Sequence, residues 1–358
     1  IFAHNSIAQP TMASLLFVKL CLFVTTVEGY MNSPERLVFD RGVFRPTPGQ
    51  KRTLHWESAQ PVPIQKEIKL LMSGNLVRKG EFGPLYGSRA LEVELECCEV
   101  GLTFHQALSI RKQIMMGKLL QGCWKLKEPR IMKSIIDKFE HQQKPLLEIA
   151  EQYDLPPVSI FREILAPRVL SANSQSGYVK RKPPARRIVQ SIINESSQDN
   201  MKSFLSEWEM KELQTAKNHD VVGYKSNCTA AEDWEQQIYN FLDEQGIRYV
   251  TEDSLKLQGC ETKTIGTPDC LLVDDLMING RPIRWIEFKS FYASGLKENS
   301  YFIKKSVSKQ VEKYQAEFGE SGAVILKNGF SNKISERYPS TLFLDGGPLY
   351  SANEYSNW

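Results

Sequence analysis

Apolar residues in the carboxy-terminal part of the chain recur with two different spacings. A stripe at helical spacing consists of Ala231, Trp234, Ile238, Phe241 and Leu242. Two apolar runs follow, Cys270–Val273 and Arg284–Ser290, and the aromatic and branched residues of the second run favour a strand. Between the runs lies Asn279–Gly280, which is a strong hairpin signal. The pattern therefore predicts a helix followed by a pair of antiparallel strands.

Helical spacing also marks the residues before this region, and it begins near Phe104. Residues 146–166 have the layout of two helices joined by a turn at residues 154–156, which is typical of a helix-turn-helix. In this layout Ile160 and Ile164 anchor the second helix. The outward positions of that helix would be Ser159, Arg162 and Glu163. Such units dock proteins as well as DNA, so contact between Arg162 and DNA is one of two alternatives.

Charged residues occupy particular places in the two predicted strands. Thr267-Pro268-Asp269 opens the first strand, and the second carries Glu287 and Lys289. Residues two apart in a strand face the same side, and pairing of the strands brings Asp269 beside Glu287. Two adjacent carboxylates repel each other unless a cation such as Mg²⁺ or Mn²⁺ joins them, and a nearby lysine can prepare a water for attack on phosphorus. The pattern predicts a metal-dependent phosphodiesterase site.

A simpler interpretation treats Asp269 as a turn residue and the other two charges as an exposed pair. The residues around those charges, Trp285, Ile286 and Phe288, are large and apolar, which favours a buried strand. Because buried charges need a partner or a metal, we prefer the first interpretation.

The Thr-Pro-Asp and Arg-Trp-Ile-Glu-Phe-Lys-Ser motifs resemble those of the PD-(D/E)xK nuclease superfamily and, within it, the family of codanin-interacting nucleases. The resemblance covers roughly Lys144 to Asp345 and includes Thr251–Leu255 and Asn328–Phe330. It implies a restriction-endonuclease-like α/β core, in which a central mixed sheet is flanked by helices. It also implies dependence on a divalent metal and a codanin-like protein partner. Phe288 departs from the small polar residue of the relatives, which leaves both charges in place.

Two further elements carry candidate site residues. The superfamily usually supplies another acid from the helix before the sheet, and Glu235 lies at the edge of the apolar stripe there. An ordinary solvated helix acid is the alternative. Downstream, Gln310 and Tyr314 are four residues apart and share one face of a predicted helix. They resemble a supporting pair of some superfamily members, although this spacing also arises often in amphipathic helices.

Composition sets limits on the partners. The chain has 358 residues, 41% hydrophobic and 24% charged, with a net charge of +3. Affinity for nucleic acid must therefore come from local basic patches. The clearest patch consists of Lys180, Arg181, Lys182, Arg186 and Arg187, and it could contact phosphates, serve as a nuclear-import signal or form a solvated approach to a helix. Seven cysteines without Cys-x-x-Cys spacing favour neither disulfides nor zinc.

The first hundred residues are the hardest to interpret. The chain opens at Ile1, and Met12 and Met31 are later possible starts. Residues 15–24 resemble a short secretory segment, but Lys19 interrupts them and no small-residue cleavage site follows. The segment from Gly42 onward is rich in Pro and Gly and shows no sustained periodicity of apolar residues. We expect residues 1–102 to be a poorly ordered extension or not to belong to the natural chain.

These observations predict an α/β domain preceded by an all-α domain with a helix-turn-helix. The predicted parts are the extension 1–102, a helical domain 103–175, a basic linker with helices 176–217, a nuclease-like domain 218–346 and a tail 347–358. The predicted function is hydrolysis of phosphodiester bonds in nucleic acid, with DNA favoured. The resemblance to the codanin-interacting nucleases implies a location in the nucleus and cytoplasm. We expect no membrane and no small-molecule cofactor. The alternatives are a catalytically silent scaffold derived from a nuclease and a helix-turn-helix DNA-binding protein.

Overall fold

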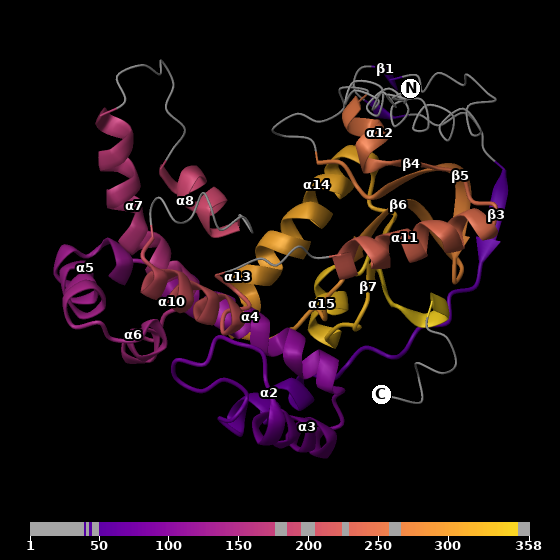
Figure 1. The fold of residues 1–358 in the computed structure, drawn as a ribbon. Coiled ribbons are helices and arrows are strands. Elements are labelled where there is room, and N and C mark those ends of the chain that lie inside the picture. The colour runs from indigo at the N-terminus through magenta and orange to yellow at the C-terminus, as the bar shows by residue number, and fades with distance from the viewer. Residues whose placement is uncertain are drawn as a thin grey trace, which may run out of the picture. The chain divides into compact units, whose positions relative to one another are not determined.

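The computed structural model describes most of the chain beyond residue 49. The described residues are 39–40, 43–44, 50–175, 185–194, 205–223, 229–257 and 266–349. The chain divides into two compact units, Ile1–Thr47 and Pro48–Trp358. Within the first unit the described residues form the strands β1 (Phe39–Asp40) and β2 (Val43–Phe44), which pair antiparallel. All other described elements belong to the second unit (Figure 1).

A mixed sheet of six strands forms the centre of the second unit. Its strands are β3 (Lys51–Leu54), β4 (Tyr249–Thr251), β5 (Cys270–Ile278), β6 (Arg281–Lys289), β7 (Gly322–Leu326) and β8 (Leu342–Asp345). The order is β3-β5-β6-β7-β8, and β4 also pairs with β5. Strands β6, β7 and β8 are parallel, and β5 is antiparallel to β6. Asn279 and Gly280 connect β5 to β6 with φ values of 49° and 78°, which suit a tight hairpin turn. The predicted hairpin is confirmed.

Helices cover both faces of this sheet. Helix α11 (Thr229–Glu244) packs its predicted apolar stripe, including Trp234 and Ile238, against one face. Helix α14 (Lys309–Phe318) covers the other, where the rings of Tyr314 and Trp285 meet at 5.2 Å. The remaining elements of this part are α12 (Glu252–Leu257), η3 (Lys297–Asn299), α13 (Ser300–Ile303), η4 (Lys304–Ser308), α15 (Asn332–Arg337) and η5 (Gly347–Leu349). The predicted α/β arrangement, a mixed sheet flanked by helices, is confirmed.

Residues 50–102 do not have the poor order that we expected from their composition. Strand β3 pairs in parallel with β5, and two helices follow, α2 (Ile64–Met72) and α3 (Gly87–Val100). Gly74, Gly80, Gly87 and Gly101, which suggested disorder, lie at positive φ in turns or at helix ends. Sequence periodicity missed these elements because α3 buries only Val93 and Cys97, too few for an apolar stripe, and because the partner strand of β3 lies more than 200 residues away.

A helical region connects these elements to the rest of the unit. Helix α4 (Phe104–Gly122) begins at Thr103 with a capping box, which agrees with the periodicity that begins near Phe104. The other elements are η1 (Lys125–Lys127), α5 (Pro129–Ile136), η2 (Asp137–His141), α6 (Leu146–Tyr153), α7 (Pro157–Gln175), α8 (Ala185–Asn194) and α10 (Glu207–Asn218). An apolar core joins α5 to α8 and α10. Among the described residues, no helix is long and apolar enough to cross a membrane.

Helices α6 and α7 flank the turn that we predicted at residues 154–156, but the outward face assigned to α7 is partly wrong. Ser159 is 4% exposed, whereas Arg162 and Glu163 are half-buried. The Arg162 guanidinium donates to the Gly223 carbonyl at 2.8 Å. Asp220 accepts from the amide of Val158 at 3.0 Å, so a neighbouring loop covers the start of α7. Use of this pair of helices as a helix-turn-helix stays a prediction.

Candidate functional site

The hairpin β5–β6 brings the two predicted carboxylates together. Cys270 pairs with Ile286, so Asp269 lies directly before the paired region and opposite Glu287. The Phe288 amide donates to Asp269 Oδ2 at 2.6 Å. Within β6, Glu287 and Lys289 face the same side, and Lys289 Nζ forms an ion pair with Glu287 Oε1. The predicted juxtaposition of Asp269, Glu287 and Lys289 is present.

The environment of these carboxylates opposes their ionisation. Burial raises the pKa of Asp269 well above its ordinary value and Glu287 raises it further, while Lys289 and the Phe288 amide lower it. Burial likewise raises the pKa of Glu287, and the ion pair with Lys289 and the hydroxyl of Tyr314 oppose that rise. Glu287 is 3% exposed, and its Oε2 is buried without a hydrogen-bond partner among the described residues. One carboxylate oxygen at the centre of the site is thus left unsatisfied.

Helix α11 contributes a third acid to the electrostatics of the site. Burial raises the pKa of Glu235, Lys289 lowers it, and Glu252 and Glu287 add to the rise. Glu235 therefore lies within electrostatic range of the β6 charges, as its place at the edge of the apolar stripe suggested. Among the described residues, however, no group of three or more His, Cys, Asp or Glu side chains is placed to hold a metal ion. The structure does not assemble the three acids into one ligand set.

The helix α14 supports the Thr-Pro-Asp segment from the opposite face. The hydroxyl of Tyr314 donates to the Thr267 carbonyl at 3.0 Å, and Tyr314 is 2% exposed. Burial raises the pKa of Tyr314 and the charge of Glu287 adds to it, so this phenol stays protonated. Gln310 is half-buried, and its Oε1 lacks a partner among the described residues. The structure thus gives Tyr314 a supporting contact and leaves the contribution of Gln310 a prediction.

Sequence reasoning missed Glu252 as part of the site. Thr267 Oγ1 donates to Glu252 Oε1 at 3.1 Å, and the Glu252 amide donates to the Asp269 carbonyl at 3.3 Å. Lys256 pairs with the same carboxylate at 2.9 Å. Glu252 stands at the junction of β4 and α12, where neither strand nor helix periodicity marks a residue. The resemblance segment Thr251–Leu255, which contains it, was the available signal.

The residues of the predicted basic patch have no described side chains. Lys180, Arg181 and Lys182 are outside the described residues, and for Arg186 and Arg187 only the backbone of α8 is described. Their contact with nucleic acid stays a prediction.

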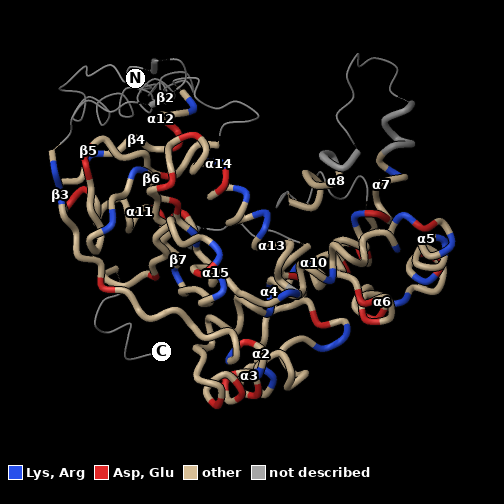
Figure 2. The backbone as a smooth tube through the Cα atoms, turned by 180° about the vertical axis from the view of Figure 1, so that it is seen from behind, with Lys and Arg blue, Asp and Glu red and all other residues tan. Residues whose placement is uncertain are grey.

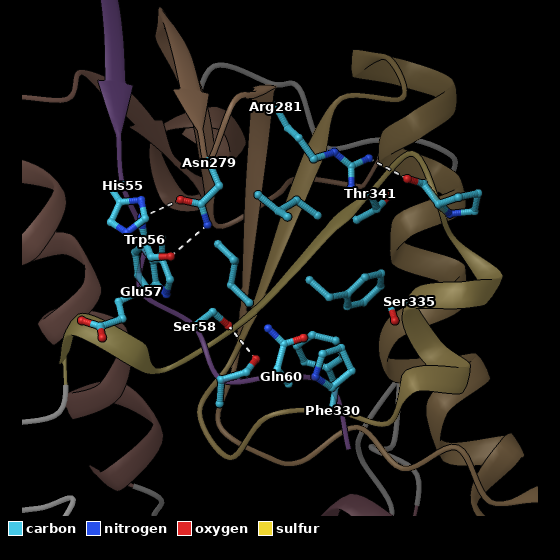
Figure 3. A pocket seen from close by; sticks show the side chains of 16 residues that line it. His55, Trp56, Glu57, Ser58, Gln60, Asn279, Arg281, Phe330, Ser335 and Thr341 are labelled. Atoms are coloured by element: carbon cyan, nitrogen blue, oxygen red, sulfur yellow. Dashed lines mark hydrogen bonds between the residues drawn. The ribbon is translucent and has the colours of Figure 1, made fainter. Parts of the chain in front are cut away.

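A separate pocket of about 450 Å³ lies at the other end of the hairpin (Figure 3). Asn279 accepts from the Trp56 amide at 2.9 Å and donates to its carbonyl at 2.8 Å. Arg281 donates to the Pro339 carbonyl at 2.6 Å. Ten residues of strand separate Asn279 from Asp269, roughly 30 Å at 3.3 Å per residue. The pocket is therefore distinct from the carboxylate site, and its polar groups already bind the backbone.

Comparisons with known proteins support the resemblance drawn from the motifs. Residues 205–345, which contain the mixed sheet from β4 to β8 and the carboxylate site, match the family described as "Protein of unknown function TPD sequence-motif". Curated relatives carry the name CDAN1-interacting nuclease 1. The one from Xenopus tropicalis is 26% identical over 204 residues, 57% of this chain and 61% of the relative. The one from Danio rerio is 21% identical over 258 residues, 67% of this chain and 77% of the relative.

The relative from Bos taurus is 24% identical over 194 residues, 53% of this chain and 61% of that protein. The chain thus spans about three fifths of the length of the first relative and of the Bos taurus relative. No solved structure matches. The similarity to the codanin-interacting nucleases is confirmed by the family match and by these relatives.

Proposed function

We propose that this protein is a metal-dependent nuclease with a restriction-endonuclease-like core, which hydrolyses phosphodiester bonds in nucleic acid, with DNA favoured. The observation that carries the proposal is the arrangement around β6. Asp269 and Glu287 are adjacent and largely buried, Lys289 pairs with one oxygen of Glu287, and the other oxygen has no partner among the described residues. The name of the relatives, which says nuclease, supports the same class.

The residues fit a hard divalent cation such as Mg²⁺ or Mn²⁺. Mg²⁺ prefers oxygen ligands, uses one or two carboxylates and keeps several waters. Asp269 and Glu287 would hold it, with the Phe288 carbonyl, and Glu235 would reach it directly or through water. Bound there, it would lower the pKa of a coordinated water and polarise the phosphate. The unsatisfied Glu287 Oε2 and the raised pKa of Asp269 both indicate a site that lacks positive charge.

The remaining steps belong to the side chains of this chain. Lys289, held as an ammonium by Glu287, would donate a hydrogen bond that orients the attacking water, and the proton of that water would pass to solvent. Its ammonium would also offset negative charge that develops on the phosphorus oxygens. The Phe288 amide keeps Asp269 in place, and Tyr314 fixes the backbone of Thr267 two residues earlier. The site would thus hold its charged groups before the substrate arrives.

A second candidate is a catalytically silent scaffold that binds a codanin-like protein. One observation favours it, namely that no three acids converge into a ready ligand set among the described residues. Calorimetry separates the two candidates. A nuclease should show heat on titration with Mn²⁺ or Mg²⁺, and that heat should disappear in Asp269→Ala. A scaffold with a decayed site should show equal, negligible heat in both proteins.

The experiment that tests the proposal is cleavage of a labelled panel by the purified full chain. The panel contains single-stranded, duplex, flap and junction DNA together with RNA, each with Mg²⁺ or Mn²⁺. We expect cutting of at least one substrate by the wild type and none by Glu287→Gln. If neither protein cuts, or if both cut equally, the proposal is wrong.

A further inference from the structure

One face of the rod formed by α13, η4 and α14 carries an exposed aromatic residue and three exposed lysines in a single row. Its members are Tyr301, Lys305, Lys309 and Lys313, each four residues after the last. Tyr301 is 56% exposed, which is unusual for a large aromatic side chain. The opposite face is buried and consists of Ile303, Val307 and Val311. We call these four exposed residues the Tyr-Lys row.

The π-helical turn in the middle of the rod keeps this row on one face. In an α-helix a row with four-residue spacing drifts by about 40° at each step. The five residues of η4 (Lys304–Ser308) form a wider turn, because π-helical hydrogen bonds run from i to i+5, and this reduces the drift. Figure 2 shows Lys or Arg positions, in blue, along the tube between α14 and α13.

The row ends beside the candidate nuclease site. A Cβ on Gly266 would lie 3.5 Å from Lys313 Cδ and 3.0 Å from Tyr314 Cε1. The stem of Lys313 therefore passes close to the residue that precedes Thr267-Pro268-Asp269. The next residue of the same helix, Tyr314, donates to the Thr267 carbonyl. Helix α14 thus connects the Tyr-Lys row directly to the segment that presents Asp269.

The charge of the row is not neutralised within the described part of the chain. No ion pair there involves Lys305, Lys309 or Lys313. The acids of α14, Glu312 and Glu317, form no ion pair with the row among the described residues, and Glu312 accepts from the Tyr338 hydroxyl at 3.4 Å. Lysines at helical intervals suit the phosphates of a nucleic-acid backbone, and an exposed ring at one end suits the face of an unpaired base.

We propose that the Tyr-Lys row binds a single-stranded segment of nucleic acid, with phosphates against the lysines and a base stacked on Tyr301. The proposal rests on the proposed nuclease function for the direction of the strand, which would lead past Lys313 to Asp269. From Tyr301 to Lys313 the rod rises about 18 Å. At 3.4 Å or more per nucleotide, this length serves roughly three to five nucleotides.

The first test measures the salt dependence of binding. Affinity of the full chain for a fluorescent single-stranded oligonucleotide is measured in EDTA, without cutting, over a range of NaCl concentrations. Lys305→Gln/Lys309→Gln/Lys313→Gln should bind on the order of 100-fold more weakly near 0.1 M salt. The slope of log K against log salt should fall by about 2, because three phosphate contacts at about 0.7 each are lost. The matched control changes the exposed helix residues Lys69, Lys112 and Lys211 to Gln and should keep the wild-type slope.

The second test isolates stacking from charge. Tyr301→Ala should weaken binding of the single strand about tenfold, whereas Tyr301→Phe should bind like the wild type because it keeps the ring. An oligonucleotide of abasic residues should bind wild type and Tyr301→Ala equally. Circular dichroism and thermal unfolding check that the exposed substitutions leave the fold intact.

The outcomes separate this proposal from the proposed function. Equal salt slopes for the row variant and the control, or no nucleic-acid binding by the wild type, would overturn the row. A row variant that loses duplex binding as strongly as single-strand binding, with no effect of Tyr301→Ala, would overturn the single-strand assignment. If the wild type cuts but its binding does not depend on the Tyr-Lys row, the nuclease proposal stands and the row proposal is wrong. If binding depends on the row but no substrate is cut, the row proposal stands and the nuclease proposal is wrong.

Discussion

Two buried glutamates lie near the end of β6. Glu287 belongs to the strand, Glu67 contacts the loop that follows it, and their surroundings differ. Glu67 of α2 is completely buried and accepts from Tyr292 Oη at 2.9 Å, Ser294 Oγ at 2.5 Å and the Gly295 amide at 3.1 Å. Glu287, within β6, pairs with Lys289 through Oε1, and its Oε2 makes no hydrogen bond within the described residues, although the Tyr314 hydroxyl lies near enough to lower the pKa of this carboxyl. Burial raises the pKa of both carboxyls. Hydrogen bonds from its own chain oppose the rise at Glu67, and Lys289 and the Tyr314 hydroxyl oppose it at Glu287.

The difference teaches how to separate structural from functional acids. A carboxylate whose oxygens are all satisfied by its own chain holds that chain together, and here Glu67 ties α2 to the loop that follows Lys289. A buried carboxylate with an unsatisfied oxygen is destabilising by itself. Such a group is retained where something outside the chain completes it. Each of the following predictions tests this contrast.

The largest expected effect is on catalysis. Asp269→Ala and Glu287→Gln should each lower the cleavage rate at least about 1000-fold, which corresponds to roughly 4 kcal/mol in the activation barrier. The reason is that each removes a carboxylate that would hold the metal, and Glu287→Gln also removes the partner of Lys289. The measurement is the single-turnover rate on the best substrate of the panel. Asp275→Ala, which removes an exposed acid of the same strand β5, is the control and should cut normally. A Glu287→Gln protein that cuts at the wild-type rate contradicts the site.

The next effect is on stability and concerns the other acid. Glu67→Ala should lower the free energy of unfolding by about 3 kcal/mol, because the hydroxyls of Tyr292 and Ser294 and the Gly295 amide lose their acceptor in a buried place. Urea denaturation measures the change. The exposed Glu94→Ala on α3 should stay within about 0.5 kcal/mol of the wild type. A change that small in Glu67→Ala would mean that this cluster does not stabilise the fold.

Metal should then stabilise one region and not the other. At a concentration 100-fold above its dissociation constant, Mg²⁺ or Mn²⁺ should add about 2.7 kcal/mol to the free energy of unfolding. The increment should persist in Tyr292→Phe, which alters only the Glu67 cluster, and vanish in Glu287→Gln. Thermal unfolding with and without metal measures it. An increment that survives in Glu287→Gln would place the metal elsewhere.

The smallest expected effect is on the pH dependence of stability in the absence of metal. Because burial raises the pKa of Glu287 in the folded state above its ordinary value near 4.5, the folded protein binds this proton more tightly than the unfolded chain. Stability from this group is therefore greatest below that value and falls as pH rises, by less than about 1.4 kcal/mol per pH unit. In Glu287→Gln the fall should be shallower in urea titrations between pH 4 and 7. Parallel curves for both proteins would argue against a strained carboxylate.

Sequence reasoning succeeded where the signal was local. The hairpin at Asn279–Gly280 and the spacing within β6 depend on neighbouring residues, and they were enough to place Asp269 next to Glu287. The stripe of α11 likewise set the place of Glu235, since helical phase follows from sequence alone. The alternation of buried and exposed positions carried this information directly.

Sequence reasoning failed where the surroundings of a residue depend on distant segments of the chain. Strand β3 has its partner in β5, and Glu67 meets Tyr292 225 residues later, so neither has a local signature. Ser159 appeared outward because the pattern of one helix cannot show that the loop at Asp220 covers it. Glu252 was missed since it lies where two elements meet.

The parallel pairing of β3 with β5 also has a consequence for synthesis of the chain. The amide of Gln50, just before β3, bonds to Asp274, 224 residues further along. At about 5–20 residues per second, roughly 10 to 45 s pass between the emergence of these two segments from the ribosome. During that time β3 has no strand to pair with and presents an open edge to other nascent chains. Chaperones that bind extended segments would have their main opportunity in this interval.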